Sequence, residues 1–416
     1  MDVRPADPAC RTYRRWVVLA PTAASTGAPA APSPPARLVS LDLLRLVAAV
    51  GVVVYHFTAR RTSAWGDAQP DLVPDAVTRW ASYGSLGPEL FFVISGFVIL
   101  MTAWGRTTVA VVASRIGRLY PSYWVAVLLT GALLLLVWPE GKHVTPGQVA
   151  ANLTMLQAVV GVDHVDGVYW TLWAELRFYL LMGLLVLVGV TRRRVLTVAL
   201  LWPPVALLVQ RLGAADLAEL LVSDYAPLFA AGMALYLVHR DGHAVAPWLV
   251  VVVNTALAVV LRTPVTVRGL EHTTGVVPST AGVAAALAAC VVLVAVVAVV
   301  PLPRLDRTWL VSAAALTYPV YLVHQYWGLW LISRTVEHVP AWLAVLAAVA
   351  FSFGLAWVVH RLVEARWAPV LRRRVEAALT RGRDALLARL NAGPRVLGAA
   401  AGGAGRAVRR APRSGA

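Results

Sequence analysis

One apolar stretch that carries three charged or titratable side chains constrains the fold of this chain more than any other feature. Residues 38–57, LVSLDLLRLVAAVGVVVYHF, are long enough to cross a bilayer as a helix. A passive membrane anchor would not tolerate Asp42, Arg45 and His56 in such a run. In a regular α-helix, Arg45 and His56 are separated by about three turns, so both lie on one face, roughly 16 Å apart. Asp42 precedes Arg45 by one turn, and we expect this polar stripe to face a bundle interior or a wet cavity.

The rest of the chain supplies the helices of that bundle. Of the 416 residues, 59% are hydrophobic and 14% are charged, which is typical of an integral membrane protein. The sequence therefore predicts an all-α, polytopic membrane protein with about ten transmembrane helices. The ten apolar segments lie near residues 38–57, 85–104, 119–138, 169–190, 195–212, 220–238, 246–262, 280–300, 309–333 and 341–362.

The formal net charge of +16 comes from arginines that lie mostly between and after the apolar segments. Membrane topology explains this distribution, which argues against nucleic-acid binding. Connections that contain Arg115, Arg118 and residues 192–194 alternate with connections poorer in cations, so we expect both termini in the cytoplasm and a multi-pass protein of the plasma membrane. The only cysteines, Cys10 and Cys290, favour neither a disulfide framework nor a thiolate metal site, and we expect no metal.

The two ends of the chain are expected to be cytoplasmic tails around a membrane domain at residues 38–365. Residues 1–37 hold several arginines, an Ala/Pro/Ser-rich run and an apolar patch too short for a signal peptide, which predicts disorder. A twin-arginine signal at Arg14–Arg15 is the alternative. Within residues 366–416, the sequence from Val370 predicts a basic amphipathic helix on the anionic lipids of the inner leaflet, followed by a low-complexity end.

Three further titratable side chains fall inside apolar segments. Glu89 lies about one turn below the outer surface, where a carboxylate needs a cation or a proton-sharing partner on another helix. Glu175 lies about two turns into the fourth segment, and His324 lies in the outer half of the ninth. A lone intramembrane histidine is usually a packed, hydrogen-bonded residue. Together with His56, however, these residues lie at similar depth on four segments, as expected of a buried site.

Arg115 and Arg118 lie between the second and third segments, on one side of a helical turn just inside the membrane. Pro121 is expected to begin the third span directly after them. The pair either follows from positive-inside topology or forms an anion clamp, because guanidinium offers forked donors suited to phosphate. In the second segment, Ser95–Gly96 leave a similar choice between close helix packing and a chemical role.

Five of these patterns, in this order, resemble the integral-membrane acyltransferase 3 family, which includes bacterial O-acetyltransferases that act on surface polysaccharides and antibiotics. They are the Arg45 to His56 spacing, FFVISGF, RIGRLYP, WTLWAELRFY and YPVYLVHQ, and the resemblance covers about residues 38–365. The chain departs from the family pattern in two places. Many members have a Glu-Glu-Gln run where this chain has Glu175, Leu176 and Arg177. Some members also carry a C-terminal extracytoplasmic hydrolase-like domain, where this chain has a short basic tail.

The resemblance implies a membrane acyltransferase that moves a short acyl group from cytoplasmic acyl-CoA, with acetyl-CoA as the first candidate. The implied acceptor is a hydroxyl of a carbohydrate, a glycolipid or a glycosylated metabolite. Such transfer needs a base for the alcohol, donors for the oxyanion and a hold on the carrier's phosphates. A polytopic transporter of an acylated or sugar substrate is the alternative, and it predicts two similar halves, of which the sequence gives no sign.

The expected roles in acyl transfer are as follows. His56 is the general base or carries the acyl group, and Glu175 orients its ring. Arg115 and Arg118 hold the coenzyme A phosphates. The residues expected to support the site or to lie on its acceptor side are Asp42, Arg45, Glu89 and His324.

Overall fold

A computed structural model describes residues 38–68, 72–300 and 307–392. The secondary structure in these ranges is helical and includes no strand, which confirms the predicted all-α polytopic class. Eight helices in the described ranges are long and apolar enough to cross a membrane. The two other predicted spans correspond to the helices labelled α10 and α14, and in α10 every residue from Ala226 to Val238 is buried. The predicted tails at residues 1–37 and 393–416 lie outside the described residues.

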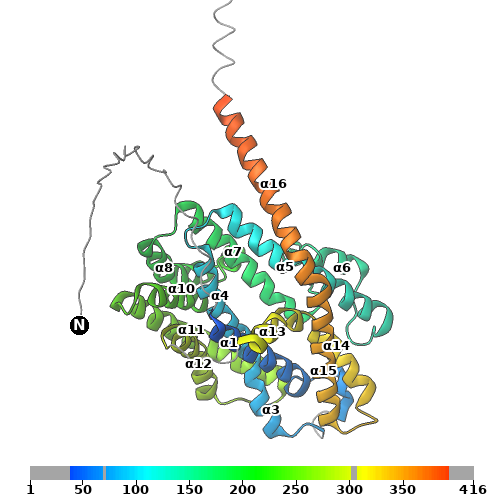
Figure 1. The fold of residues 1–416 in the computed structure, drawn as a ribbon. Helices are drawn as coiled ribbons and strands as arrows, with labels where there is room; N and C mark the ends of the chain where they lie inside the picture. The colour runs from blue at the N-terminus through cyan, green and yellow to red at the C-terminus, as the bar shows by residue number, and fades with distance from the viewer. Residues whose placement is uncertain (1–37, 69–71, 301–306, 393–416) are drawn as a thin grey trace, which may run out of the picture. The chain divides into compact units, whose positions relative to one another are not determined.

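Figure 1 shows how the helices are arranged. In chain order, the helices and short π- or 3-10-helical turns (η) are α1 (Val39–Val54), η1 (Tyr55–Ala59), η2 (Ser63–Ala68), α3 (Asp75–Ala81), η3 (Ser82–Leu86), α4 (Gly87–Ala103), α5 (Thr108–Ala132), η4 (Leu133–Val137), α6 (Pro146–Asn152), η5 (Gln157–Val160), η6 (Gly167–Tyr169), α7 (Trp170–Val188), α8 (Arg192–Arg211), α9 (Ala215–Leu220), α10 (Ala226–Asp241), α11 (Val245–Thr274), α12 (Thr280–Val299), α13 (Arg307–Ala315), α14 (Thr317–Thr335), α15 (Ala341–Val359), η7 (His360–Glu364) and α16 (Ala365–Ala392).

Helix α10 lies among α4, α8, α11 and α12, and glycines make its closest contact with α4 (Figure 1). A Cβ atom on Gly96 would lie 2.1 Å from the carbonyl oxygen of Phe229, and one on Gly232 would lie 2.0 Å from that of Val93. Small residues let helix backbones approach closely in a membrane, where no hydrophobic driving force holds helices together. Close packing therefore explains Gly96.

The two largest of the three buried apolar clusters lie side by side in the bundle. One is built around α4, α7 and α10, and the other around α5, α14 and the connection between α5 and α7. Phe91 and Tyr179 pack against both clusters. The candidate site lies where these two clusters meet.

Helix α5 begins earlier than the sequence predicts, and this changes the setting of the arginine pair. The Thr107 hydroxyl accepts from the backbone N–H of Ala110 and caps a helix that starts at Thr108. Arg115, Arg118 and Pro121 therefore lie inside α5, and the prediction that Pro121 begins the span is wrong.

Helix α11 also extends further than predicted, to Thr274 rather than residue 262. The apolar run that marked the segment ends at Arg262, and this arginine pairs with Glu89 on α4. Arg262 therefore lies within α11 and not in the connection that follows it.

The helix that begins as α1 becomes π-helical at Tyr55, one residue before His56. A π turn adds a residue to the turn, so the regular spacing assumed between Arg45 and His56 ends at this point. Both side chains still face protein rather than lipid, but they lie in different parts of the site.

Helix α15 continues through η7 into α16, which confirms the helix predicted from Val370. The first part of α16 packs against α5, and a Cβ on Gly117 would lie only 2.6 Å from the Cβ of Arg372. A position for α16 on the inner leaflet stays a prediction.

Candidate functional site

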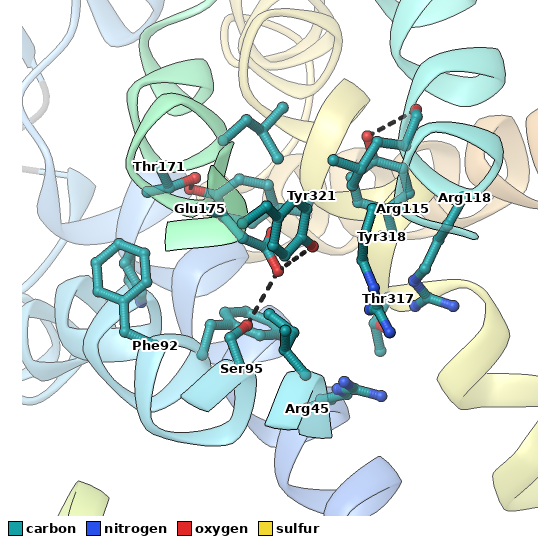
Figure 2. Close-up of a pocket in the computed structure, with 16 residues that line it drawn as sticks. Arg45, Phe92, Ser95, Arg115, Arg118, Thr171, Glu175, Thr317, Tyr318 and Tyr321 are labelled. Atoms are coloured by element: carbon teal, nitrogen blue, oxygen red, sulfur yellow. Dashed lines mark hydrogen bonds between the residues drawn. The ribbon is translucent and has the colours of Figure 1, made fainter. Parts of the chain in front are cut away.

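A cavity of about 80 Å³ lies between α1, α4, α5, α7 and α14 (Figure 2). Its polar lining consists of arginines, one carboxylate and hydroxyl groups, whereas Phe91, Phe92 and Leu119 form part of its apolar wall. The polar residues that line it are Arg45, Ser95, Arg115, Arg118, Thr171, Glu175, Tyr179, Thr317, Tyr318 and Tyr321.

Glu175 is held in the cavity by two hydroxyl donors. The Ser95 Oγ donates to Glu175 Oε1 at 3.0 Å, and the Tyr179 hydroxyl donates to the same oxygen at 2.6 Å (Figure 2). Two hydroxyl donors on one oxygen fix the orientation of the carboxyl group. Ser95 thus has a role in this site, while the neighbouring Gly96 serves packing.

The three arginines of the cavity come from two helices. Arg45, on α1, forms an ion pair with Asp42 at 3.5 Å, which confirms that these two residues share a face. Arg115, on α5, donates to Thr102 Oγ1 at 2.5 Å, and its guanidinium lies 5.7 Å from the centre of the Tyr179 ring. Among the described residues, none accepts a hydrogen bond from the buried Arg115 Nε.

Arg118 lies on the cavity side of α5 one turn after Arg115 and is exposed. Three guanidinium groups therefore face one lining carboxylate, Glu175. An excess of positive charge in a partly enclosed cavity favours an anionic ligand, and the forked donors of arginine suit phosphate oxygens.

His56 and His324 form a buried pair that joins η1 to α14. Their side chains are 7% and 0% exposed, and His324 Nε2 lies 3.3 Å from His56 Nδ1. His324 Nδ1 lies 3.1 Å from the carbonyl oxygen of Val320 and 2.9 Å from that of Tyr321. Because carbonyl oxygens only accept, Nδ1 of His324 carries the proton and its Nε2 is the acceptor.

The same reasoning assigns the tautomer of His56. Its Nδ1 lies 2.9 Å from the carbonyl oxygen of Val52 and faces the acceptor nitrogen of His324, so Nδ1 must carry the proton. Nε2 of His56 is then the nitrogen with an unshared electron pair, as a general base requires. The sequence assigned the orienting role to Glu175, but the contacts that hold the ring come from Val52 and His324.

Helix α14 connects the cavity with the histidine pair. Tyr321 lines the cavity, and its ring centre lies 5.9 Å from that of His324, one turn further along the helix. The Tyr321 hydroxyl lies 2.8 Å from Thr171 Oγ1, another lining residue. Neither histidine lines the cavity itself, and Tyr321 is the lining residue that contacts His324.

Glu89 has the intramembrane partner that the sequence predicts. Arg262 Nη2 lies 3.4 Å from Glu89 Oε1 and 3.1 Å from the hydroxyl of Tyr225. The Glu89 side chain lies outside the cavity lining, although Pro88 and Phe91 on the same helix contribute to it. The geometry gives Glu89 a place in helix packing rather than in the cavity.

The connection between α5 and α7 carries a buried acid beyond the predicted site. Asp166 is fully buried, and its Oδ1 accepts from the backbone N–H of Val168 at 3.1 Å. Burial raises the pKa of Asp166 to about 7. Burial also lowers the pKa of nearby His164, as does the ammonium group of Lys142, which donates to the His164 carbonyl oxygen at 2.6 Å.

Residues 38–361 match the acyltransferase domain of the acyltransferase 3 family. The chain belongs to this family. No curated protein and no solved structure gives a match. As an acyltransferase 3 family member, the protein is a multi-pass membrane acyltransferase.

The tyrosines of the cavity are not among the site residues predicted from the sequence. Tyr179 follows Glu175 by four residues on α7, and Tyr321 precedes His324 by three residues on α14. Both spacings place side chains on one helical face, and this signal could have identified them. Thr171 precedes Glu175 by four residues on α7, and Tyr318 precedes Tyr321 by three on α14, so the same signal applies to them.

Proposed function

We propose that this acyltransferase moves a short acyl group, with acetyl as the first candidate, from cytoplasmic acyl-CoA to a hydroxyl of a carbohydrate-containing acceptor. The acceptor class comprises polysaccharides, glycolipids and glycosylated metabolites, and the site of action is the plasma membrane. Family membership supports acyl transfer in general. The observation that carries the finer proposal is the arginine-rich cavity next to the His56–His324 pair.

The donor half of the proposal rests on charge. Coenzyme A carries several phosphate charges at one end and its thioester at the end of a long, neutral arm. Arg45, Arg115 and Arg118 would bind the phosphates, and the unpartnered Nε of Arg115 provides one donor for them. The arm would then extend along α14, past Tyr321, towards His324 and His56.

The acyl-transfer half rests on the tautomer of His56. In direct transfer, the acceptor oxygen bonds to the thioester carbon while its proton moves to His56 Nε2. The carbon–sulfur bond breaks, and the proton passes from Nε2 to the departing sulfur of coenzyme A. The carbonyl of Val52 and Nε2 of His324 accept from Nδ1, so they would stabilise the imidazolium that forms between these events.

Kinetics of Arg118 variants test the donor site. If Arg118 binds phosphate in the ground state and in the transition state alike, Arg118→Ala should chiefly raise the KM for acetyl-CoA. Arg118→Lys should restore the KM only in part, because a point charge lacks the bidentate geometry of guanidinium. Both variants would be purified in detergent and their rates divided by the amount of folded enzyme.

Arg193 provides the matched control, because it is an exposed arginine in the first turn of α8 and lies outside the cavity. Arg193→Ala should leave the KM for acetyl-CoA unchanged even if less protein inserts. A KM that is also unchanged in both Arg118 variants would return Arg118 to a purely topological role and refute this donor site.

A further inference from the structure

A second hollow, here called the outer groove, lies at the N-terminal end of α7. It has a volume of about 510 Å³, within the range of small-molecule sites. Its walls come from the connection before α7, the first turns of α7, the end of α8, α9 and the segment that leads into α10. In the predicted topology this end faces away from the cytoplasm.

Aromatic side chains form one wall of the outer groove. Trp170, Trp173 and Tyr225 line it, and each is partly exposed. The Trp170 and Tyr225 ring centres lie 5.2 Å apart with an angle of 31° between the rings. Aromatic rings present a large, rigid, apolar surface at low entropic cost, and sugar rings have an apolar C–H face that packs on such a surface.

Polar side chains form the other wall, and hydrogen bonds and an ion pair hold them in position. Trp173 Nε1 donates to Glu219 Oε1 at 2.7 Å, and Arg177 lies 3.7 Å from the same carboxylate and donates to the Glu219 backbone carbonyl. Gln210 Nε2 donates to Asp224 Oδ1 at 3.3 Å. Each carboxylate can accept about four hydrogen bonds, so both retain capacity for the hydroxyl groups of a ligand.

The charge of the outer groove differs from that of the cavity. Its lining includes one guanidinium, Arg177, and two carboxylates, Glu219 and Asp224, while the lowered pKa of His164 leaves that ring neutral at pH 7. The cavity has three guanidinium groups and one carboxylate. Phosphates are therefore disfavoured in the groove, which suits a neutral ligand rich in hydroxyl groups.

A single aromatic layer separates the outer groove from the cavity. Phe92 lines the cavity, and its ring centre lies 6.0 Å from that of Trp170 and 4.8 Å from that of Tyr225 in the groove. Thr171, the residue after Trp170, also lines the cavity. The Thr171 hydroxyl lies 2.8 Å from that of Tyr321, whose ring centre lies 5.9 Å from that of His324, so the groove is one layer of side chains from the path proposed for the acyl arm.

We propose that the outer groove binds a neutral sugar ring of the acyl acceptor, through the Trp170–Trp173–Tyr225 wall and the carboxylates of Glu219 and Asp224. This inference rests on the proposed function. The acceptor site would differ from the proposed donor site in its lining residues, its charge and its place in the bundle.

The test compares groove variants with matched variants outside the groove. Asp224→Asn removes an exposed acid of the groove, and Asp216→Asn removes an exposed acid of α9 that does not line it. Trp173→Ala removes an aromatic wall residue, and Trp80→Ala removes a tryptophan that is 79% exposed on α3. Purified protein would be given [¹⁴C]acetyl-CoA and membranes of a strain that lacks the gene, which contain the unmodified acceptor.

Label in the glycolipid and polysaccharide fractions would be measured against the amount of membrane added. The two groove variants should raise the apparent KM for acceptor membranes by about tenfold, the order expected for one hydrogen bond to a charged group or one aromatic contact. The KM for acetyl-CoA and its slow hydrolysis without membranes should stay unchanged. Asp216→Asn and Trp80→Ala should match the wild type in every measurement.

Three outcomes would overturn the proposal in distinguishable ways. Sugar labelling with an unchanged acceptor KM in both groove variants would refute the groove site and leave the proposed function standing. Label that acid hydrolysis and mass spectrometry place on a molecule without sugar would refute the carbohydrate acceptor and the groove together. Absence of any labelled product with the wild-type protein would refute the proposed function itself.

Discussion

Replacement of His324 by phenylalanine should slow acyl transfer without weakening donor binding. His324 Nε2 lies 3.3 Å from His56 Nδ1, and the substituted ring fills similar space without an acceptor. Because His56 becomes charged when it takes the proton, the lost hydrogen bond is worth about 1.5–3 kcal/mol. At 1.36 kcal/mol for each factor of ten, kcat should fall about 10- to 150-fold. The carbonyl of Val52 still accepts from Nδ1, so the loss should stay below that of His56→Ala.

The assay is release of coenzyme A from acetyl-CoA by purified protein in detergent, with and without acceptor membranes. A positioning role predicts a lower kcat, an unchanged KM for acetyl-CoA and partial recovery in His324→Gln, because the glutamine amide oxygen can accept from His56. A variant that merely disturbs packing would lose folded protein instead, and glutamine would not rescue it. Wild-type kcat in His324→Phe would refute the assigned tautomers and the role of His324.

Three further predictions concern stability. Glu89→Gln or Arg262→Gln leaves one buried charge without its partner and should lower the free energy of unfolding by about 3–5 kcal/mol. The double variant should lose less than the sum of the two single losses. Thermal unfolding in detergent would measure these differences. Gly96→Val should prevent folding, because even its Cβ would lie 2.1 Å from a carbonyl oxygen of α10. Gly183→Val is the control, because a Cβ there meets no atom within 4 Å. In size-exclusion chromatography, only the Gly183 variant should give the peak of the folded protein. Burial raises the pKa of Asp166 from 3.8 to about 7. Between these two values the folded chain retains a proton that the unfolded chain has released. The free energy of unfolding should therefore fall as the pH rises from about 4 to about 7. Asp166→Asn should flatten that decline in unfolding temperatures measured across this pH range.

Charged pairs at the arginine-rich cavity were predictable because the two members of each pair lie on one helix. Asp42 and Arg45 are three residues apart, as are Arg115 and Arg118, and such spacings fix a shared face before any packing is known. The need of Glu89 for an intramembrane cation likewise follows from the cost of an unpaired charge in a low-dielectric medium. The identity of that cation did not follow, because Arg262 lies 173 residues away in the sequence.

The sequence by itself determined the all-helical membrane class, the family and the charged residues of the cavity, because hydropathy and helical period are local properties of the chain. Only the tertiary structure decided which of these residues meet. It placed His324, rather than Glu175, against His56, and it gave Glu175 to Ser95 and Tyr179. The His56–His324 and Ser95–Glu175 contacts join residues that are 268 and 80 positions apart, and no local pattern encodes which distant segments pack together.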